Sequence, residues 1–116
     1  MKRLDVLVVD DDDDVLGPTA DLLRTRHHVR VANGLREAVD QLVRQVPDAI
    51  VCDFDLPPYR GDVLLGLVAR EHPEVRRVLY TASPIEPTEV RFDCAHSVLI
   101  KPASARALFA AVAGEE

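Results

Sequence analysis

The sequence contains no tryptophan, only two cysteines and no long apolar run. The cysteines, Cys52 and Cys94, show no CxxC spacing and no secretory signal accompanies them, so we expect two free thiols. A membrane-spanning helix would need roughly 20 consecutive apolar residues, which the sequence does not offer. Asp5 also interrupts the start of the chain, where a signal peptide needs an uninterrupted apolar segment. We therefore expect a cytoplasmic protein that does not enter a membrane.

Positive charge is scarce as well. Lysine and arginine together number 14, against 20 aspartates and glutamates, which gives a formal net charge of −6. Nucleic acids are bound mainly through clustered lysines and arginines. The sequence has no such cluster, so we expect no nucleic-acid binding by this domain. Lysine is found only at Lys2 and Lys101, and the lysine inside the chain, Lys101, is therefore a candidate for a specific role.

The sequence does contain a regular alternation of strand-like and helix-like apolar segments. Short apolar runs, most of them rich in β-branched residues, predict five strands, at residues 4–9, 28–32, 49–52, 78–80 and 98–100. Apolar residues at helical spacing predict four helices, at residues 12–26, 35–46, 62–72 and from 104 onward. Asp12, Asp62 and Ser104 are expected to cap three of these helices. Residues 56–61 are expected to form a loop.

Prolines limit two of these elements. Proline fits only the first turn of a helix, so Pro18 predicts either a late start or a distorted beginning for the helix at residues 12–26. Pro84 and Pro87 leave room for only a short or irregular helix near residues 88–94. This segment would be the fourth of five helices along the chain.

The order of the elements predicts the fold class. Strands and helices alternate strictly with short connections, and neither a linker nor a repeat divides the chain, so we expect one domain over residues 1–116. Such alternation implies right-handed crossovers and a parallel sheet. The sequence therefore predicts a three-layer α/β fold, with a five-stranded parallel sheet and helices on both faces.

Polar residues follow four of the predicted strands directly. They are Asp10 and Asp11, Asp53, Thr81 and Lys101. Ligands of open parallel sheets bind beyond the carboxyl ends of the strands, where these side chains would meet. Carboxylates held close together raise one another's pKa unless a cation intervenes, and oxygen ligands suit Mg²⁺ or Mn²⁺. The pattern predicts a divalent metal site, although a run of aspartates at residues 10–14 is by itself more typical of a solvated loop.

Four segments of the sequence resemble the signature segments of response-regulator receiver domains. They are VLVVDDDDDV, VCDFDLPPYRG, VLYTAS and LIKP, and they follow one another in that family's order over nearly the whole chain. Pro57 lies four residues after Asp53 and Gly61 eight residues after it, as in the family. The resemblance implies the flavodoxin-like receiver fold with strand order 2-1-3-4-5.

The resemblance also implies roles for the residues at the strand ends. Asp53 would be the phosphoacceptor, and Thr81 and Lys101 would contact the phosphoryl oxygens. Mg²⁺ (or Mn²⁺) would be held by Asp10, Asp11, Asp53 and the backbone carbonyl of Asp55. The phosphodonor would be a sensor histidine kinase, a phosphotransfer protein or a small molecule, and the output would be a downstream effector domain or protein. Such a domain assists its own phosphorylation and dephosphorylation but is not otherwise an enzyme.

Three positions depart from the family pattern. Val98 stands where receivers usually carry an aromatic residue that turns inward as the threonine moves. The stretch between Thr81 and Lys101 is slightly short and rich in proline, which affects the usual docking face. Asp55 adds one more negative charge beside the expected metal. These departures leave open a degenerate receiver that binds partners without phosphorylation.

A second alternative is a phosphohydrolase similar to the haloacid dehalogenases. Asp53-Phe54-Asp55 resembles the DxD motif of that family, but Pro57 stands where it usually has threonine or valine, and the chain has no room for a cap domain. The four histidines share no metal-ligand spacing, so we expect surface or loop positions for them. They are His27, His28, His72 and His96.

Overall fold

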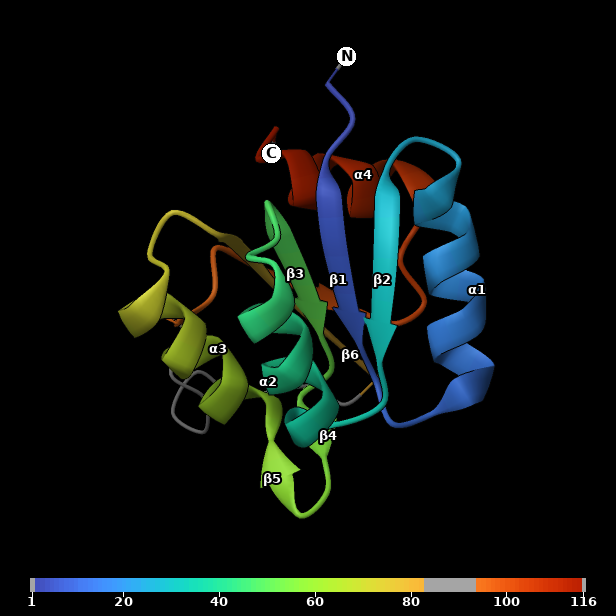
Figure 1. Cartoon of the computed structure of the whole chain (residues 1–116). Helices are drawn as coiled ribbons and strands as arrows, with labels where there is room; N and C mark the ends of the chain where they lie inside the picture. Colours follow the sequence, from blue (N-terminus) through green and yellow to red (C-terminus); the bar gives the residue numbers. More distant parts are fainter. Residues whose placement is uncertain (1, 83–93, 116) are drawn as a thin grey trace.

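The computed structural model describes residues 2–82 and 94–115. Five strands form one parallel sheet in the order β2-β1-β3-β6-β7, which confirms the predicted topology (Figure 1). These strands are β1 (Asp5–Val9), β2 (His28–Ala32), β3 (Ala49–Cys52), β6 (Arg76–Thr81) and β7 (Ser97–Ile100). The helices in the described part of the chain are α1 (Asp13–Arg24), α2 (Leu35–Arg44), α3 (Gly61–Glu71) and α4 (Ala105–Ala113).

The sheet is covered on both faces, which gives the three predicted layers. Successive side chains of a strand point to opposite faces, so neighbours in β1 enter different cores. Leu7 packs in a cluster with residues of α2 and α3, whereas Val8 packs in a cluster with residues of α1 and α4. Figure 1 shows the same division of the helices between the two sides of the sheet. All four residues of β3, the central strand, are buried.

Helix α1 starts where the sequence places it, in spite of its proline. The Asp12 carboxylate caps the helix by accepting a hydrogen bond of 2.9 Å from the Asp14 backbone N–H, and Pro18 lies inside the helix. Of the two alternatives that Pro18 left open, the late start is therefore wrong. Pro18 removes one backbone donor, but it lies on the exposed side, while the opposite side buries Leu16 and Leu23 against the sheet. Packing of the apolar face thus outweighs the local cost of the proline.

Two expectations around α3 are also wrong. The helix begins at Gly61 with Arg60 in the capping position, and Asp62 lies inside the first turn instead of capping it. The Asp62 carboxylate instead forms an ion pair with Arg60. The expected loop at residues 56–61 contains most of a small antiparallel hairpin, formed by β4 (Asp55–Leu56) and β5 (Tyr59–Arg60).

The short helix expected at residues 88–94 falls mainly in residues 83–93, which lie outside the described residues. Cys52 and Cys94 are free thiols, as expected, and both are buried. His27 lies in the bend between α1 and β2, which is one of the loop positions expected, but it is buried: its Nδ1 atom accepts a hydrogen bond from the Leu4 N–H and its ring lies 6.0 Å from that of Phe109. None of the helices within the described residues has the length and apolar character to span a membrane.

Candidate functional site

Three carboxylates meet at the carboxyl edge of the sheet. Asp10 follows β1 and Asp53 follows β3, and their backbone N–H groups continue the sheet by donating to Ala32 (3.1 Å) and Val9 (3.0 Å). One oxygen each of Asp10, Asp11 and Asp53 lies within 4.8 Å of the others. Asp10 and Asp53 are buried, whereas Asp11 is exposed. The site therefore combines two buried, desolvated carboxylates with one carboxylate that is open to solvent.

Lys101 brings the positive charge to these carboxylates. It follows β7, and its backbone N–H donates to the Thr81 carbonyl over 2.8 Å. Its Nζ atom lies 2.6 Å from Asp10 Oδ2 and 3.3 Å from Asp53 Oδ2. The ammonium also lies 5.5 Å from the centre of the Tyr80 ring. A single ammonium thus bridges two of the three carboxylates.

The charges at this edge are not balanced, and the pKa values reflect this. Burial raises the pKa of Asp53, the Asp10 charge raises it further, and Lys101 only partly opposes both. Burial acts to lower the pKa of Lys101, but the hydrogen bond to Asp10 and the charges of Asp53 and Asp10 together outweigh it and raise that pKa. An additional cation would favour the ionised carboxylates. The oxygen-only donor set fits a hard divalent ion such as Mg²⁺.

Thr81 and Asp55 take different places at the site. Thr81 ends β6, is fully buried, and contacts Lys101 through its backbone carbonyl. The Asp55 side chain is exposed and does not belong to the group of three carboxylates. Its backbone N–H donates to Asp53 Oδ1 over 3.4 Å. The structure therefore brings together Asp10, Asp11, Asp53 and Lys101, and it joins Asp55 to them only through the main chain.

Gly61 has a steric reason for its position eight residues after Asp53. A Cβ atom at Gly61 would lie 1.9 Å from the backbone oxygen of Asp53, so no other residue fits without moving the main chain. The Gly61 N–H also donates to the carbonyl of Phe54 over 2.5 Å. The start of α3 therefore rests directly on the peptide that carries Asp53.

The sequence matches the family model of the response regulator receiver domain over residues 6–113. The chain belongs to this family. The carboxylates and the lysine described above thus lie at the strand ends of a receiver domain of the kind found in two-component response regulators.

Individual relatives and structures are similar to this receiver domain over different lengths. The chain is 33% identical, over 76 residues, to protein-glutamate methylesterase/protein-glutamine glutaminase 3 of Geobacter metallireducens, which covers 63% of this chain and 21% of that protein. It is 39% identical, over 79 residues, to an uncharacterized 14.6 kDa protein in the sodA1 3′ region of Leptolyngbya boryana, covering 64% of this chain and 56% of that one. The matches thus span about a fifth and just over half of the lengths of these relatives.

The fold has close counterparts among solved structures. The crystal structure of a putative response regulator from Chloroflexus aurantiacus superposes with a TM-score of 0.86 and is 29% identical, with 98% of each chain covered. The receiver-domain structure from Methanospirillum hungatei gives a TM-score of 0.88 at 21% identity, covering 98% of this chain and 94% of that one. At 21% identity, the likeness to the Methanospirillum hungatei structure shows a shared fold alone.

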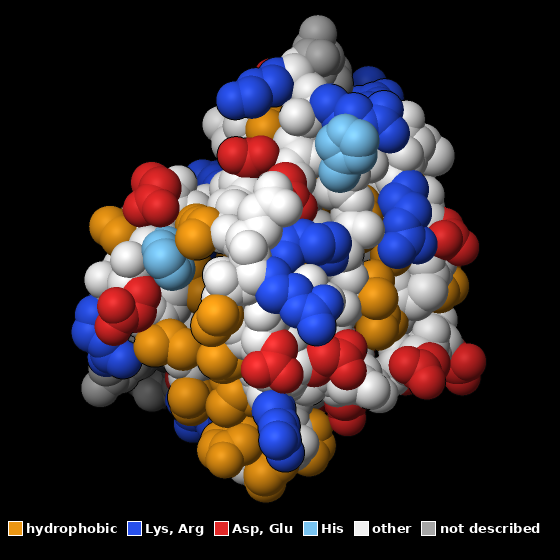
Figure 2. Space-filling view, viewed as in Figure 1, with side chains coloured by type: hydrophobic (Ala, Val, Ile, Leu, Met, Phe, Trp, Pro, Cys, Tyr) orange, Lys and Arg blue, Asp and Glu red, His pale blue; other side chains and the backbone are white. Residues whose placement is uncertain are grey.

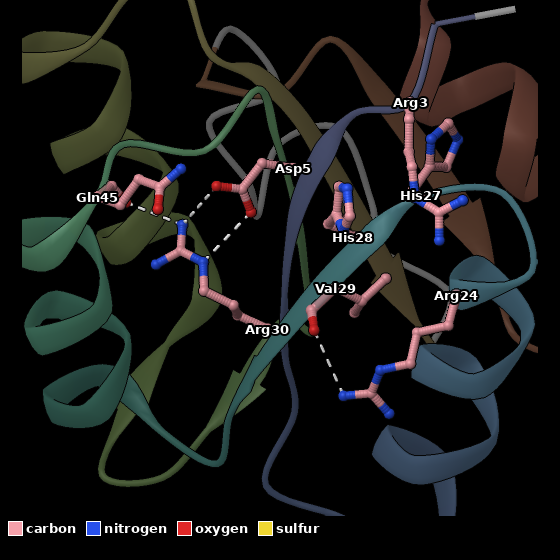
Figure 3. A pocket seen from close by; sticks show the side chains of 8 residues that line it. All are labelled: Arg3, Asp5, Arg24, His27, His28, Val29, Arg30 and Gln45. Atoms are coloured by element: carbon pink, nitrogen blue, oxygen red, sulfur yellow. Dashed lines mark hydrogen bonds and ion pairs between the residues drawn. The ribbon is translucent and has the colours of Figure 1, made fainter.

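The receiver domain has a second polar region, a hollow of about 490 Å³ at the opposite end of β1 and β2 (Figure 3). The Arg30 guanidinium binds both Asp5 carboxylate oxygens at 3.2 Å and donates to the Gln45 carbonyl over 2.9 Å. Arg24 donates to the Val29 carbonyl over 3.4 Å. Arg24 also pairs with Asp21 at 3.3 Å, so each of these arginines has one carboxylate partner as well as backbone carbonyls, and the hollow differs in chemistry from the acidic edge.

Apolar side chains gather on one face of the receiver domain. Figure 2 shows them over α2, α3 and the β4–β5 hairpin. The Val43 side chain is 83% exposed, and Val63 and Tyr59 are each 52% exposed. Among the described residues, these three side chains remain largely open to solvent.

Sequence reasoning missed one pair of charged residues beside Asp53. Arg60 and Asp62 flank Gly61 and form an ion pair, with the Arg60 guanidinium 5.1 Å from the centre of the Phe54 ring. The sequence offered one indication of this pair, namely two opposite charges on either side of a glycine. Only the fold shows that this pair lies against the residue following Asp53.

Proposed function

We propose that this receiver domain accepts a phosphoryl group on the Asp53 carboxylate in a Mg²⁺-dependent reaction and thereby switches a partner-binding surface in two-component signal transduction. The observation that carries the proposal is the position of Asp53. This buried carboxylate has the ammonium of Lys101 at 3.3 Å and belongs to a group of three carboxylates within 4.8 Å. A candidate nucleophile, a positive charge and a set of oxygen ligands for a metal therefore lie close together at this edge of the sheet.

The residues would divide the chemistry among themselves. A bond forms between an Asp53 carboxylate oxygen and phosphorus, while the bond from phosphorus to the donor breaks and the leaving group departs with the electron pair. Lys101 offsets negative charge on the equatorial phosphoryl oxygens, and the Thr81 hydroxyl donates a hydrogen bond to one of them. Asp10, Asp11, Asp53 and the Asp55 carbonyl are the groups that would hold Mg²⁺ or Mn²⁺. When bound, that ion supplies further positive charge beside the transferred group.

The proposal includes the setting of the reaction. The phosphodonor is a sensor histidine kinase, a phosphotransfer protein or a small phosphodonor, and the phosphorylated domain acts on a downstream effector domain or protein. The domain promotes its own phosphorylation and dephosphorylation in the cytoplasm and does not turn over other substrates.

The proposed switch works without a rotating aromatic side chain at residue 98. Tyr80 packs on the α1 and α4 side, where its hydroxyl accepts a hydrogen bond of 3.1 Å from the Ala103 N–H. Val98 packs on the opposite side of the sheet, and its branched side chain has restricted χ1 freedom. Thr81 would therefore act through the chain that follows it. Hydrogen exchange with and without fluoroberyllate should give the same changes in Val98→Ala as in the wild type; loss of the changes in that variant would contradict this coupling.

The phosphoacceptor proposal is tested by incubation with acetyl phosphate and Mg²⁺, followed by mass spectrometry. We expect one phosphoryl adduct at Asp53 that hydroxylamine removes, as an acyl phosphate requires. Asp53→Asn should carry no such adduct. Equal labelling of Asp53→Asn and the wild type would show that the nucleophile is another residue. Absence of labelling with every donor would favour the degenerate receiver that binds partners without phosphorylation.

A further inference from the structure

A second ion pair lies next to the candidate site, within the described residues that surround Asp53. The Asp62 carboxylate is in the first turn of α3 and its side chain is only 6% exposed. Arg60 binds both of its oxygens, through Nε to Oδ1 at 3.1 Å and through Nη2 to Oδ2. This two-point contact fixes the direction of the guanidinium as well as its position. The hydrogen bond to Arg60 lowers the pKa of Asp62, so the pair is ionised at neutral pH.

The pair reaches the backbone of Asp53 through its two neighbours. The Arg60 guanidinium lies over the Phe54 ring, with 5.1 Å from Cζ to the ring centre. Gly61, between the paired residues, donates to the Phe54 carbonyl over 2.5 Å and lies so close to Asp53 that a Cβ atom would be 1.9 Å from its carbonyl oxygen. Residues 60–62 therefore hold the Asp53-Phe54 segment through its backbone and through the Phe54 side chain.

Support of this kind matters because Asp53 lies just beyond the last residue of β3. The sheet holds its N–H, but the chain after it turns away into the hairpin. The Cys52 thiol donates to the Asp53 carbonyl over 3.2 Å and also lies 3.9 Å from the Gly61 carbonyl. Burial raises the pKa of Cys52 well above its ordinary value, and nearby acids add to this, so Cys52 stays a neutral support and not a nucleophile. The orientation of the carboxylate thus depends on contacts made by its peptide as well as on its own contacts with Lys101 and the Asp55 N–H.

We propose that Arg60 and Asp62 are positioning residues for phosphoryl transfer: their ion pair fixes Phe54 and Gly61, and thereby sets the direction of the Asp53 carboxylate. This inference rests on the proposed function of Asp53. In-line attack requires close alignment of the reacting atoms, and small misplacements reduce the rate without changing the reacting groups. Neither Arg60 nor Asp62 needs to touch the phosphodonor for this effect.

The test compares acetyl phosphate labelling rates of the wild type, Arg60→Ala, Arg60→Lys and Asp62→Asn over a range of donor concentrations at saturating Mg²⁺. In Arg60→Ala we expect the maximal rate to fall about tenfold. The donor concentration at half-maximal rate should change less than about twofold, because no group that contacts the donor has been removed and saturating Mg²⁺ keeps the metal bound in every variant. Arg60→Lys should recover part of the rate, since lysine keeps the charge but not the two-point contact.

Arg70→Ala is the matched control. Arg70 lies on α3 and, like Arg60, has an acidic neighbour, Glu71 at 3.8 Å. Both side chains of this pair are largely exposed, whereas Asp62 is 6% and Arg60 54% exposed, and the Phe54 ring and Gly61 have Arg60 and not Arg70 as their neighbour. Its maximal rate should stay within about twofold of the wild type, as expected for an exposed pair of little energetic weight.

The outcomes separate this inference from the function on which it rests. If the wild type is not labelled at all, the proposed function and with it this inference are wrong. If the wild type is labelled and Arg60→Ala and Arg60→Lys have its maximal rate, only the positioning role is wrong. Asp62→Asn leaves Arg60 without its partner and can weaken folding, so circular dichroism defines a temperature at which all variants are folded. Equal rates at that temperature for the two Arg60 variants would decide against the inference.

Discussion

The two ends of the sheet each contain an ion pair, but the pairs differ in balance. At the start of the strands, the single guanidinium of Arg30 meets the single carboxylate of Asp5 at 3.2 Å. At the carboxyl edge, the single ammonium of Lys101 faces Asp10 at 2.6 Å and Asp53 at 3.3 Å, with the Asp11 carboxylate close by. The Arg30–Asp5 pair matches one positive with one negative charge, although Arg3 and Arg24 line the same hollow, whereas the carboxyl edge has three carboxylates around one ammonium. This difference separates an ion pair within the fold from the acidic edge, which we propose as the site of a cation and a phosphoryl group.

The largest expected effect comes from replacing the cation at each end of the sheet. One replacement should slow phosphorylation, and the other should lower the stability of the fold. Lys101→Met removes positive charge beside the transferred group, and we expect phosphorylation by acetyl phosphate to slow about 100-fold. Arg30→Met should leave that rate unchanged and instead lower the free energy of unfolding by about 1–3 kcal/mol, because hydrogen bonds to Asp5 and to backbone carbonyls are lost. Labelling kinetics and urea unfolding measure the two quantities. A rate loss in Arg30→Met as large as that in Lys101→Met would break the distinction between the ends.

Magnesium should stabilise the protein through the acidic edge alone. At about 100 times its Kd, one bound ion would add about 2.7 kcal/mol to the free energy of unfolding. We expect Asp11→Asn to remove most of the rise in melting temperature that Mg²⁺ causes, since it removes one of the three carboxylates. Asp5→Asn, at the other end, is the control and should keep the whole rise. Wild-type protein that melts at the same temperature with and without millimolar Mg²⁺ would have no metal site.

A smaller effect concerns pH in the absence of metal. Burial and the charge of Asp10 raise the pKa of Asp53, so the folded protein holds this proton to a higher pH than the unfolded chain does. The free energy of unfolding therefore falls as the pH rises through the raised pKa. Asp53→Asn should melt at a slightly higher temperature than the wild type at neutral pH, with no gain below the ordinary aspartate pKa.

The same substitution at the other end serves as the comparison. Asp5→Asn breaks a balanced pair with Arg30 and should lower the melting temperature at neutral pH. Thermal melts of both variants from acid to neutral pH, without metal, check the two signs. A lower melting temperature for Asp53→Asn at neutral pH would mean that its carboxylate is stabilised in the folded protein, against the proposed excess of negative charge.

The acidic edge could be predicted from the sequence because topology alone places it. Apolar runs end at Asp10, Asp53, Thr81 and Lys101, and a parallel sheet brings the carboxyl ends of its strands to one edge. No knowledge of side-chain packing was needed for that step. The proximity of Asp11 follows from its neighbour, although the metal and phosphoryl roles of these residues stay predictions.

The details that depend on packing could not be predicted in the same way. Pro18 lies inside α1 because the buried side of the helix, not the local preference of proline, decides its extent. Asp62 has the chemistry of a helix cap, but Arg60 pairs with it and Gly61 starts the helix against Asp53. His27 is polar in sequence yet buried, since Leu4 and Phe109 give its ring a donor and an aromatic neighbour. Each case depends on a partner that the order of residues does not reveal.

The central claim is that the carboxyl edge joins a metal and a phosphoryl group at Asp53. Fluoroberyllate, which mimics an attached phosphoryl group, tests it directly in a titration of the wild type and Asp53→Asn with and without Mg²⁺, followed by amide chemical shifts. We predict saturable shifts around Asp53, Thr81 and Lys101 in the wild type with Mg²⁺, and none in Asp53→Asn or without the metal. Shifts that persist in Asp53→Asn, or a wild type that does not respond in the presence of Mg²⁺, would contradict the claim.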